Sequence, residues 1–166
     1  EWEQKKVEFA ALFHDLGKLG IPDSVLLKPG KLTAEEALII QEHPIKSIEV
    51  IKPLAKVPFF EATIPGVLHH HERMDGCGYP YGLSGDDIPV IARIILIADT
   101  YDAMTTTRPY RKGLTSEIAY KELQKFAGRQ FDPHLVKVFL QAHPTWGEVD
   151  EEMSEQFVSS HFRRAA

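Results

Sequence analysis

Cysteine is nearly absent from this sequence, since Cys77 is the only one among 166 residues. One cysteine excludes an intrachain disulfide, and no secretory-type leader stands at the start of the chain. Chains with neither feature are typical of reducing compartments, so we expect a cytoplasmic protein.

Long hydrophobic runs and an excess of positive charge are missing too. The longest apolar run, from Val90 to Ala98, contains Arg93 and is too short to span a bilayer. The formal net charge is -5, whereas proteins held by the phosphate backbone of nucleic acid normally carry an excess of lysine and arginine. We therefore expect no membrane segment and no bulk nucleic-acid binding, while a few arginines can still hold a small anionic ligand.

The chain also lacks an initiator methionine, and a helical pattern has already begun at Trp2. We expect a fragment of a longer protein that carries sensory or receiver domains elsewhere. The composition, 43% hydrophobic and 26% charged residues, is that of a globular domain with a core. We assign residues 1–145 to one domain and residues 146–166 to a polar tail.

Apolar residues recur at spacings of three and four almost throughout, which predicts an all-α fold. A first helix should run to about Leu16, stop at Gly17 and lead into a loop that ends at Gly30. A second helix should begin at a capping box formed by Thr33 and Glu36 and end near His43-Pro44. A short helix is expected over 45–51, and a longer one over 58–72 with a kink at Pro65-Gly66. Another helix should start at Pro89 and run through Asp99. The last two should begin at the caps Thr115 and Asp132 and be separated at Gly128, and residues 73–88 should form a loop.

Two histidine-containing pairs, His14-Asp15 and His70-His71, are the first chemical signal. Adjacent helical residues diverge by about 100 degrees, so each pair can address two neighbouring metal positions. A single His-Asp pair is usually only a hydrogen-bonded couple, but the two pairs together indicate a pair of metal ions. His43 is a weaker candidate, and in isolation it reads as a helix cap.

Asp99 is the strongest single indication of a bound cation. It lies within an apolar run, where an ionised carboxylate costs free energy unless it is paired or bound to a cation. A buried salt bridge to Arg93 or Arg108 is the alternative, although neither explains the histidines. Imidazole and carboxylate ligands without thiolates favour iron, manganese, cobalt, nickel or zinc, and the sequence does not choose among them.

The loop after the second histidine pair contains Gly76, Gly78 and Gly82, which allow positive φ and close approach to a ligand. Tyr79 adds a ring and a hydroxyl group. Taken alone, this segment reads as an ordinary surface loop.

Cationic side chains offer contacts for phosphate. Arg108 and Arg111 present two guanidinium forks that can clamp phosphate oxygens, or they simply end a solvated helix. Lys18 lies one turn after His14 and faces either phosphate or solvent.

Five motifs in order resemble the HD-GYP family, a branch of the HD phosphohydrolase superfamily. They are His-Asp-x-Gly-Lys, Glu-His-Pro, His-His-Glu-x-x-Asp-Gly-x-Gly-Tyr-Pro-x-Gly-Leu, Ala-Asp-x-x-Asp-Ala and Arg-Pro-Tyr-Arg, and the match covers residues 9 to about 140. The resemblance implies an all-α HD-type bundle with a metal site between helices. It also implies hydrolysis of the bacterial second messenger cyclic di-GMP to pGpG or GMP, with two or three divalent ions, iron or manganese being expected.

The resemblance also implies roles for individual residues. Its metal ligands match His14, Asp15, His43, His70, His71 and Asp99, with Asp15 and Asp99 as bridging carboxylates. Asp15 and Lys18 match catalytic positions, and substrate contacts are implied for Lys18, Gly78, Tyr79, Arg108 and Arg111. Asp102, three residues after Asp99 on the same helix side, is a candidate carboxylate for supporting the metal ligands or contacting the substrate, and His69 receives no ligand role.

Three departures from the family pattern concern the ligands and the loop. Family members usually carry another histidine, sometimes with a glutamate, on an earlier helix, but the 13 residues before His14 contain no histidine. The ligand set is therefore incomplete as given. Met74 replaces a common tryptophan and Cys77 a common serine, so the loop is expected to differ in shape.

Two other classes of function remain open. One is a non-hydrolytic module that binds cyclic di-GMP or docks a diguanylate cyclase through the Gly-Tyr-Pro loop, and binding without turnover would select it. The other is an HD phosphohydrolase with another nucleotide substrate, or a diiron oxygenase built on the same ligands. The loop and the two arginines favour a cyclic dinucleotide over this second class.

Overall fold

The computed structural model describes residues 1–107 and 112–145. Within these ranges the regular secondary structure is helical, apart from isolated β-bridges. The α-helices are α1 (Trp2–Phe13), α2 (Asp23–Leu26), α3 (Ala34–Gln41), α4 (His43–Ile51), α5 (Pro58–Glu61), α6 (Ile64–His69), α7 (Val90–Thr105), α8 (Ser116–Lys125) and α9 (Pro133–Ala142). Four 3-10 helices, η1 (Leu16–Gly20), η2 (Lys52–Lys56), η3 (Gly85–Asp87) and η4 (His143–Thr145), complete them. The prediction of an all-α fold is confirmed. Arg108, Arg111 and the predicted tail over 146–166 lie outside the described residues.

Local hydrogen bonds explain where several helices begin. At α3, Glu36 N donates to Thr33 Oγ1 and Thr33 N donates to Glu36 Oε2, which is the predicted capping box. At α9, the Asp132 carboxylate accepts from the backbone N–H groups of residues 134 and 135. Thr115 precedes α8 as predicted but makes no capping hydrogen bond through its side chain.

Several helix boundaries differ from the sequence prediction. Helix α1 ends at Phe13, and the short helix α2 lies within the expected loop, where Val25 N and Leu26 N bond to Pro22 O. Helix α4 begins at His43, because the following proline fits a first turn, in which its missing N–H needs no partner. The first turn of helix α7 likewise follows Pro89, which is its N-cap.

The predicted helix over 58–72 is two short helices. The break falls at Ala62 and Thr63, so Pro65 lies in the first turn of α6 instead of kinking a continuous helix. Helix α6 ends at His69. His70 is the C-cap of α6 and keeps helical backbone angles, and the chain leaves the helix after it, which decides where the side chains of His71 and Glu72 go.

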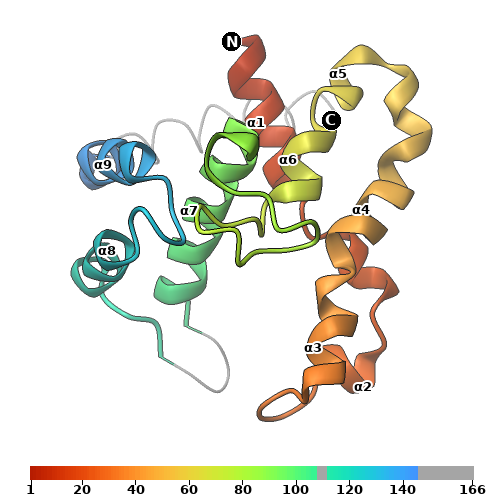
Figure 1. The fold of residues 1–166 in the computed structure, drawn as a ribbon, viewed down its shortest axis with the longest axis horizontal. Coiled ribbons are helices and arrows are strands. Elements are labelled where there is room, and N and C mark those ends of the chain that lie inside the picture. Colours follow the sequence, from red (N-terminus) through yellow and green to blue (C-terminus); the bar gives the residue numbers. More distant parts are fainter. Residues whose placement is uncertain (108–111, 146–166) are drawn as a thin grey trace, which may run out of the picture.

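Helix α7 lies between α8 and α9 on one side and α1 and α6 on the other (Figure 1), and an apolar cluster packs on each side of it. One cluster joins it to α8 and α9 and contains Leu96, Ile97, Leu123, Phe131 and Val136. The other joins it to α1, α4 and α6 and contains Ala10, Ile51, Val67 and Ile95. Asp99 is thereby held on a helix that is packed on both sides. Within the described residues, no helix has the length and apolar character needed to cross a membrane.

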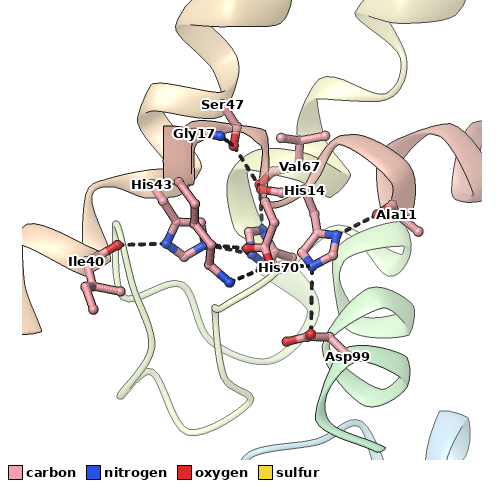
Figure 2. A network of polar contacts seen from close by, with 11 residues as sticks. Ala11, His14, Gly17, Ile40, His43, Ser47, Val67, His70 and Asp99 are labelled. Atoms are coloured by element: carbon pink, nitrogen blue, oxygen red, sulfur yellow. Dashed lines mark hydrogen bonds and ion pairs between the residues drawn. The ribbon is translucent and has the colours of Figure 1, made fainter. Parts of the chain in front are cut away.

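The chain after α1 packs very closely on α4. A Cβ atom added to Gly17 would lie 2.1 Å from His43 O and 2.4 Å from Ser47 N, so only glycine fits there. Gly17 N donates to Ser47 Oγ at 2.7 Å, and Ser47 Oγ donates to His14 O at 2.9 Å (Figure 2). These contacts hold the His14-Asp15 pair against the first turn of α4.

Candidate metal centre

The predicted ligands come from four separate segments and converge between the helices. His14 and Asp15 follow α1, His43 begins α4, His70 and His71 follow α6, and Asp99 lies on α7. The carboxylate of Asp15 and the imidazoles of His43, His70 and His71 each offer one ligand atom, and these atoms lie within 4.8 Å of one another. His14 and Asp99 flank this group, with His14 Nε2 3.8 Å from Asp99 Oδ1 (Figure 2).

Three of the histidines are oriented by backbone carbonyl groups. Each Nδ1 bonds to the carbonyl oxygen three residues earlier, which joins His14 to Ala11 at 2.5 Å, His43 to Ile40 at 2.7 Å and His70 to Val67 at 2.7 Å (Figure 2). A carbonyl oxygen only accepts, so each Nδ1 carries a hydrogen. The Nε2 atoms are thereby directed to the centre, an arrangement that is typical of histidines bound to metals.

Two of these Nε2 atoms face each other without a hydrogen between them. His43 Nε2 and His70 Nε2 are 3.2 Å apart, and both side chains are almost fully buried. Burial holds the pKa of His43 below its usual value and lowers that of His70 to about 2, so both rings are neutral near pH 7. With hydrogens on both Nδ1 atoms, two lone pairs meet in a buried space, and a cation resolves this repulsion.

The carboxylates bring negative charge to the same centre. Burial raises the pKa of Asp15, but the neighbouring His14 and Lys18 outweigh it and hold this pKa well below its usual value. The neighbouring His14 likewise lowers the pKa of Asp99. Both groups are therefore ionised at neutral pH.

The remaining two histidines match a cation in different ways. Burial lowers the pKa of His71 to about 4, which leaves its lone pair available. Burial also lowers the pKa of His14, but the carboxylates of Asp15 and Asp99 outweigh it and raise this pKa to about 10. A cation bound at His14 Nε2 takes the place of that proton.

Unsatisfied buried atoms give an independent test of whether this set fits a metal. Among the described residues, no group stands in hydrogen-bond geometry with the buried His14 Nε2 or Asp15 Oδ1, and a buried polar atom left unpaired costs free energy. Both atoms are potential ligands and both face the centre. The donor set of nitrogen and oxygen atoms fits divalent metal binding.

One of the two alternative salt-bridge partners of Asp99, Arg93, binds other carboxylates. Arg93 donates to Asp132 Oδ2 at 2.8 Å and to Asp86 Oδ1 at 3.2 Å instead. A salt bridge between Arg93 and Asp99 is therefore excluded. Arg108, the other proposed partner, lies outside the described residues.

Tyr79 is held directly beside a predicted ligand. Its ring stacks on His71 with centroids 4.7 Å apart, and Tyr79 N donates to His71 O at 3.3 Å. Gly78 permits this approach, because a Cβ there would lie 2.5 Å from both Arg73 N and His71 O. Burial, with the charges of Asp15 and Asp99, holds the pKa of Tyr79 above its usual value, so its hydroxyl remains a donor at neutral pH.

Lys18 and His69 adjoin this group, whereas Asp102 lies three residues after Asp99 on α7. Lys18 Nζ is 2.5 Å from Asp15 Oδ2, so it is directed to a ligand rather than to solvent alone. Asp102 is exposed and accepts from Thr106 Oγ1 at 3.0 Å. His69 is outside the group of four ligands, and its Nδ1 lies 3.8 Å from Glu72 Oε1.

Two residues that support the site were not assigned a role from the sequence. Ser47 joins η1 to α4, and its only sequence signal is its position four residues after His43 on one helix face. Glu72 is buried and bonds to the loop that carries Tyr79. It lies in the motif that begins His-His-Glu, but the predicted helix over 58–72 did not indicate that its side chain would point into the interior.

A sequence model described as "HD domain" matches residues 1–135. The cyclic di-GMP phosphodiesterase response regulator RpfG of Xanthomonas campestris pv. campestris is 44% identical over 140 residues, which cover 84% of this chain and 37% of that protein. A cyclic di-GMP phosphodiesterase of Thermotoga maritima is 37% identical over 161 residues, covering 94% of this chain and 44% of that protein.

A relative that is named for a different substrate also matches. The 3'3'-cGAMP-specific phosphodiesterase 2 of Vibrio cholerae is 41% identical over 141 residues, which cover 85% of this chain and 27% of that protein. The chain thus spans less than half the length of each of these three relatives.

Proposed function

Because this chain belongs to the HD domain family, in its HD-GYP branch, we propose that it is the catalytic domain of a metal-dependent phosphodiesterase that hydrolyses cyclic di-GMP to pGpG or GMP. The observation that carries this proposal is the pair of neutral imidazoles, His43 and His70, with facing Nε2 atoms beside an ionised Asp15. Relatives named as cyclic di-GMP phosphodiesterases support the choice of substrate.

We propose that two or three divalent ions, iron or manganese, occupy the centre. His14, Asp15, His43, His70, His71 and Asp99 would hold them, with Asp15 and Asp99 as shared carboxylates. Bound ions of this kind supply positive charge that lowers the pKa of water and stabilises the transferring phosphoryl oxygens. Nitrogen and oxygen ligands without thiolates support first-row metals in general.

Residues around the centre would bind and orient the substrate. Tyr79 presents a protonated hydroxyl and a ring face beside His71. Lys18, held next to Asp15, can donate a proton to the leaving oxygen or stabilise its charge. Gly78 lets the loop approach this closely, and we further propose that Arg108, Arg111 and Asp102 contact the dinucleotide.

A second substrate, 3'3'-cGAMP, has a specific observation in its favour, namely the match to a phosphodiesterase named for it. The two dinucleotides share the cyclic phosphodiester ring and differ in one base. The ligand cluster serves both equally, so side chains that contact the bases would decide between them.

The deciding experiment is anaerobic turnover of each dinucleotide, with chromatography of the products and elemental analysis of the same preparation. Iron or manganese is added back to chelator-treated protein. Metal-dependent formation of linear products from cyclic di-GMP, at a higher kcat/KM than from 3'3'-cGAMP, supports the proposal. Tight binding without any product, in protein that contains metal, would instead select the non-hydrolytic module that senses the nucleotide or docks a diguanylate cyclase.

Lys18→Met is expected to lower kcat by about a hundredfold to a thousandfold, because the leaving oxygen loses its proton donor or its charge partner. Bound metal should not change, since Lys18 is not a ligand. Steady-state kinetics and metal analysis measure the two effects. Lys125→Met is the matched control, because Lys125 pairs with Glu122 at the same sequence spacing of three on α8. Equal kcat values for the two variants would remove Lys18 from the reaction.

A further inference from the structure

Glu72 is a carboxylate enclosed by the protein, with a side chain that is 0% exposed. Its two oxygens accept from two backbone N–H groups, Tyr81 N to Oε1 at 2.8 Å and Leu83 N to Oε2 at 3.0 Å. Each of the two carboxylate oxygens accepts one amide N–H, so a single side chain holds two backbone donors at once. Glu72 thus bonds to the chain nine and eleven residues further on.

The segment it holds is the Gly-Tyr-Pro loop, which we define as residues 73–85. The base of this loop has its own anchors, because Asp75 N donates to Arg129 O at 2.8 Å and Gly85 N donates to Met74 O at 3.1 Å. An antiparallel bridge also pairs Asp75 with Ser84. Glu72 instead holds the segment that follows Pro80, and Tyr79 lies immediately before this proline.

The loop lies directly over the residues that precede it. A Cβ added to Gly78 would be 2.6 Å from Glu72 Cα, and the Tyr79 ring stacks on His71. On the other side, the ring of His69 lies 5.7 Å from the ring of Tyr81. The Gly-Tyr-Pro loop therefore packs directly against the predicted ligand His71, and Glu72 makes the hydrogen bonds to the loop from beneath.

We propose that Glu72 is a positioning residue that clamps the Gly-Tyr-Pro loop over the ligand His71 and thereby shapes the nucleotide pocket. Its kinetic consequence rests on the proposed function, whereas the clamp itself does not. The orientation of His70 depends on Val67 O instead, so loss of the clamp should weaken substrate binding without releasing metal.

Glu72→Gln tests the clamp with little change in volume. Glutamine has one acceptor oxygen, and its NH2 group cannot accept, so one of the two loop amides loses its partner. Hydrogen exchange at Tyr81 or Leu83, whichever amide faces the NH2 group, should accelerate about tenfold, the factor expected from the loss of one hydrogen bond worth about 1.4 kcal/mol. Exchange at Asp75, which bonds to Arg129, should be unchanged.

Activity and metal content of the same variant separate positioning from a general structural role. KM for cyclic di-GMP should rise about tenfold, with kcat within about threefold and metal content equal to wild type. Glu36→Gln is the matched control, because that carboxylate also accepts a backbone N–H, at Thr33, but on α3. It should alter neither exchange in the loop nor KM.

Each outcome decides a distinct point. Unchanged exchange at Tyr81 and Leu83 in Glu72→Gln would overturn the clamp. Faster exchange accompanied by loss of metal, or by an unchanged KM, would overturn the role in shaping the nucleotide pocket. If the wild-type protein hydrolyses neither cyclic dinucleotide, the proposed function fails while the exchange measurement still decides the clamp.

Discussion

His70→Ala is expected to remove bound metal and to lower turnover of cyclic di-GMP by more than about a hundredfold, the upper range for loss of a residue that merely supports a metal ligand. His70 is fully buried, and its Nε2 lies 3.2 Å from His43 Nε2. Alanine deletes one of these two lone pairs and leaves His43 and Asp15 too few partners to retain a cation. Elemental analysis and kinetics on the same preparation measure both losses.

Asp99→Ala is a second variant for the same prediction, because its side chain is 33% exposed and its removal leaves a smaller cavity. It should also lose metal and activity while the far-UV circular dichroism of the helices is retained. His69→Ala is the matched control for metal content, since it removes the neighbouring histidine that lies outside the group of ligands. Full metal content in both His70→Ala and Asp99→Ala would refute the ligand assignment.

Gly17→Ala is expected to lower the free energy of unfolding by about 3 kcal/mol, at the upper end of the cost of overpacking. The added Cβ would lie 2.1 Å from His43 O and 2.4 Å from Ser47 N. These are backbone atoms of α4, which cannot move aside without shifting the helix. The midpoint of thermal unfolding should therefore fall by about 6 to 12 °C.

The matched control is Gly20→Ala in the same 3-10 helix. A Cβ there would meet only Lys46 Cδ, at 3.2 Å, and the end of a flexible side chain can move. Chemical denaturation followed by circular dichroism compares the two variants. Gly17→Ala should also lower metal affinity, since His14 and Asp15 are held against α4 through this contact. Equal stability of the two variants would show that η1 and α4 are not held together in this way.

The sequence alone determined the helical class, the caps at Thr33 and Asp132, and the kinds of side chain available as ligands. These features depend on interactions within about four residues along the chain, or on side-chain chemistry that is the same in any fold. The resemblance to a known family then added which residues to expect together. Helix boundaries do not follow from such local signals, because a proline such as Pro65 fits both a kink inside a helix and the first turn of a new one.

Only the tertiary structure decided which groups meet. Arg93 is six residues before Asp99 in the sequence, yet it pairs with Asp132, which is 39 residues away. Ser47 bonds across 30 residues to Gly17, and Glu72 turns into the interior because α6 ends at His69. Contacts of this kind depend on how helices pack and where each one stops, and neither periodicity nor a local motif encodes that packing.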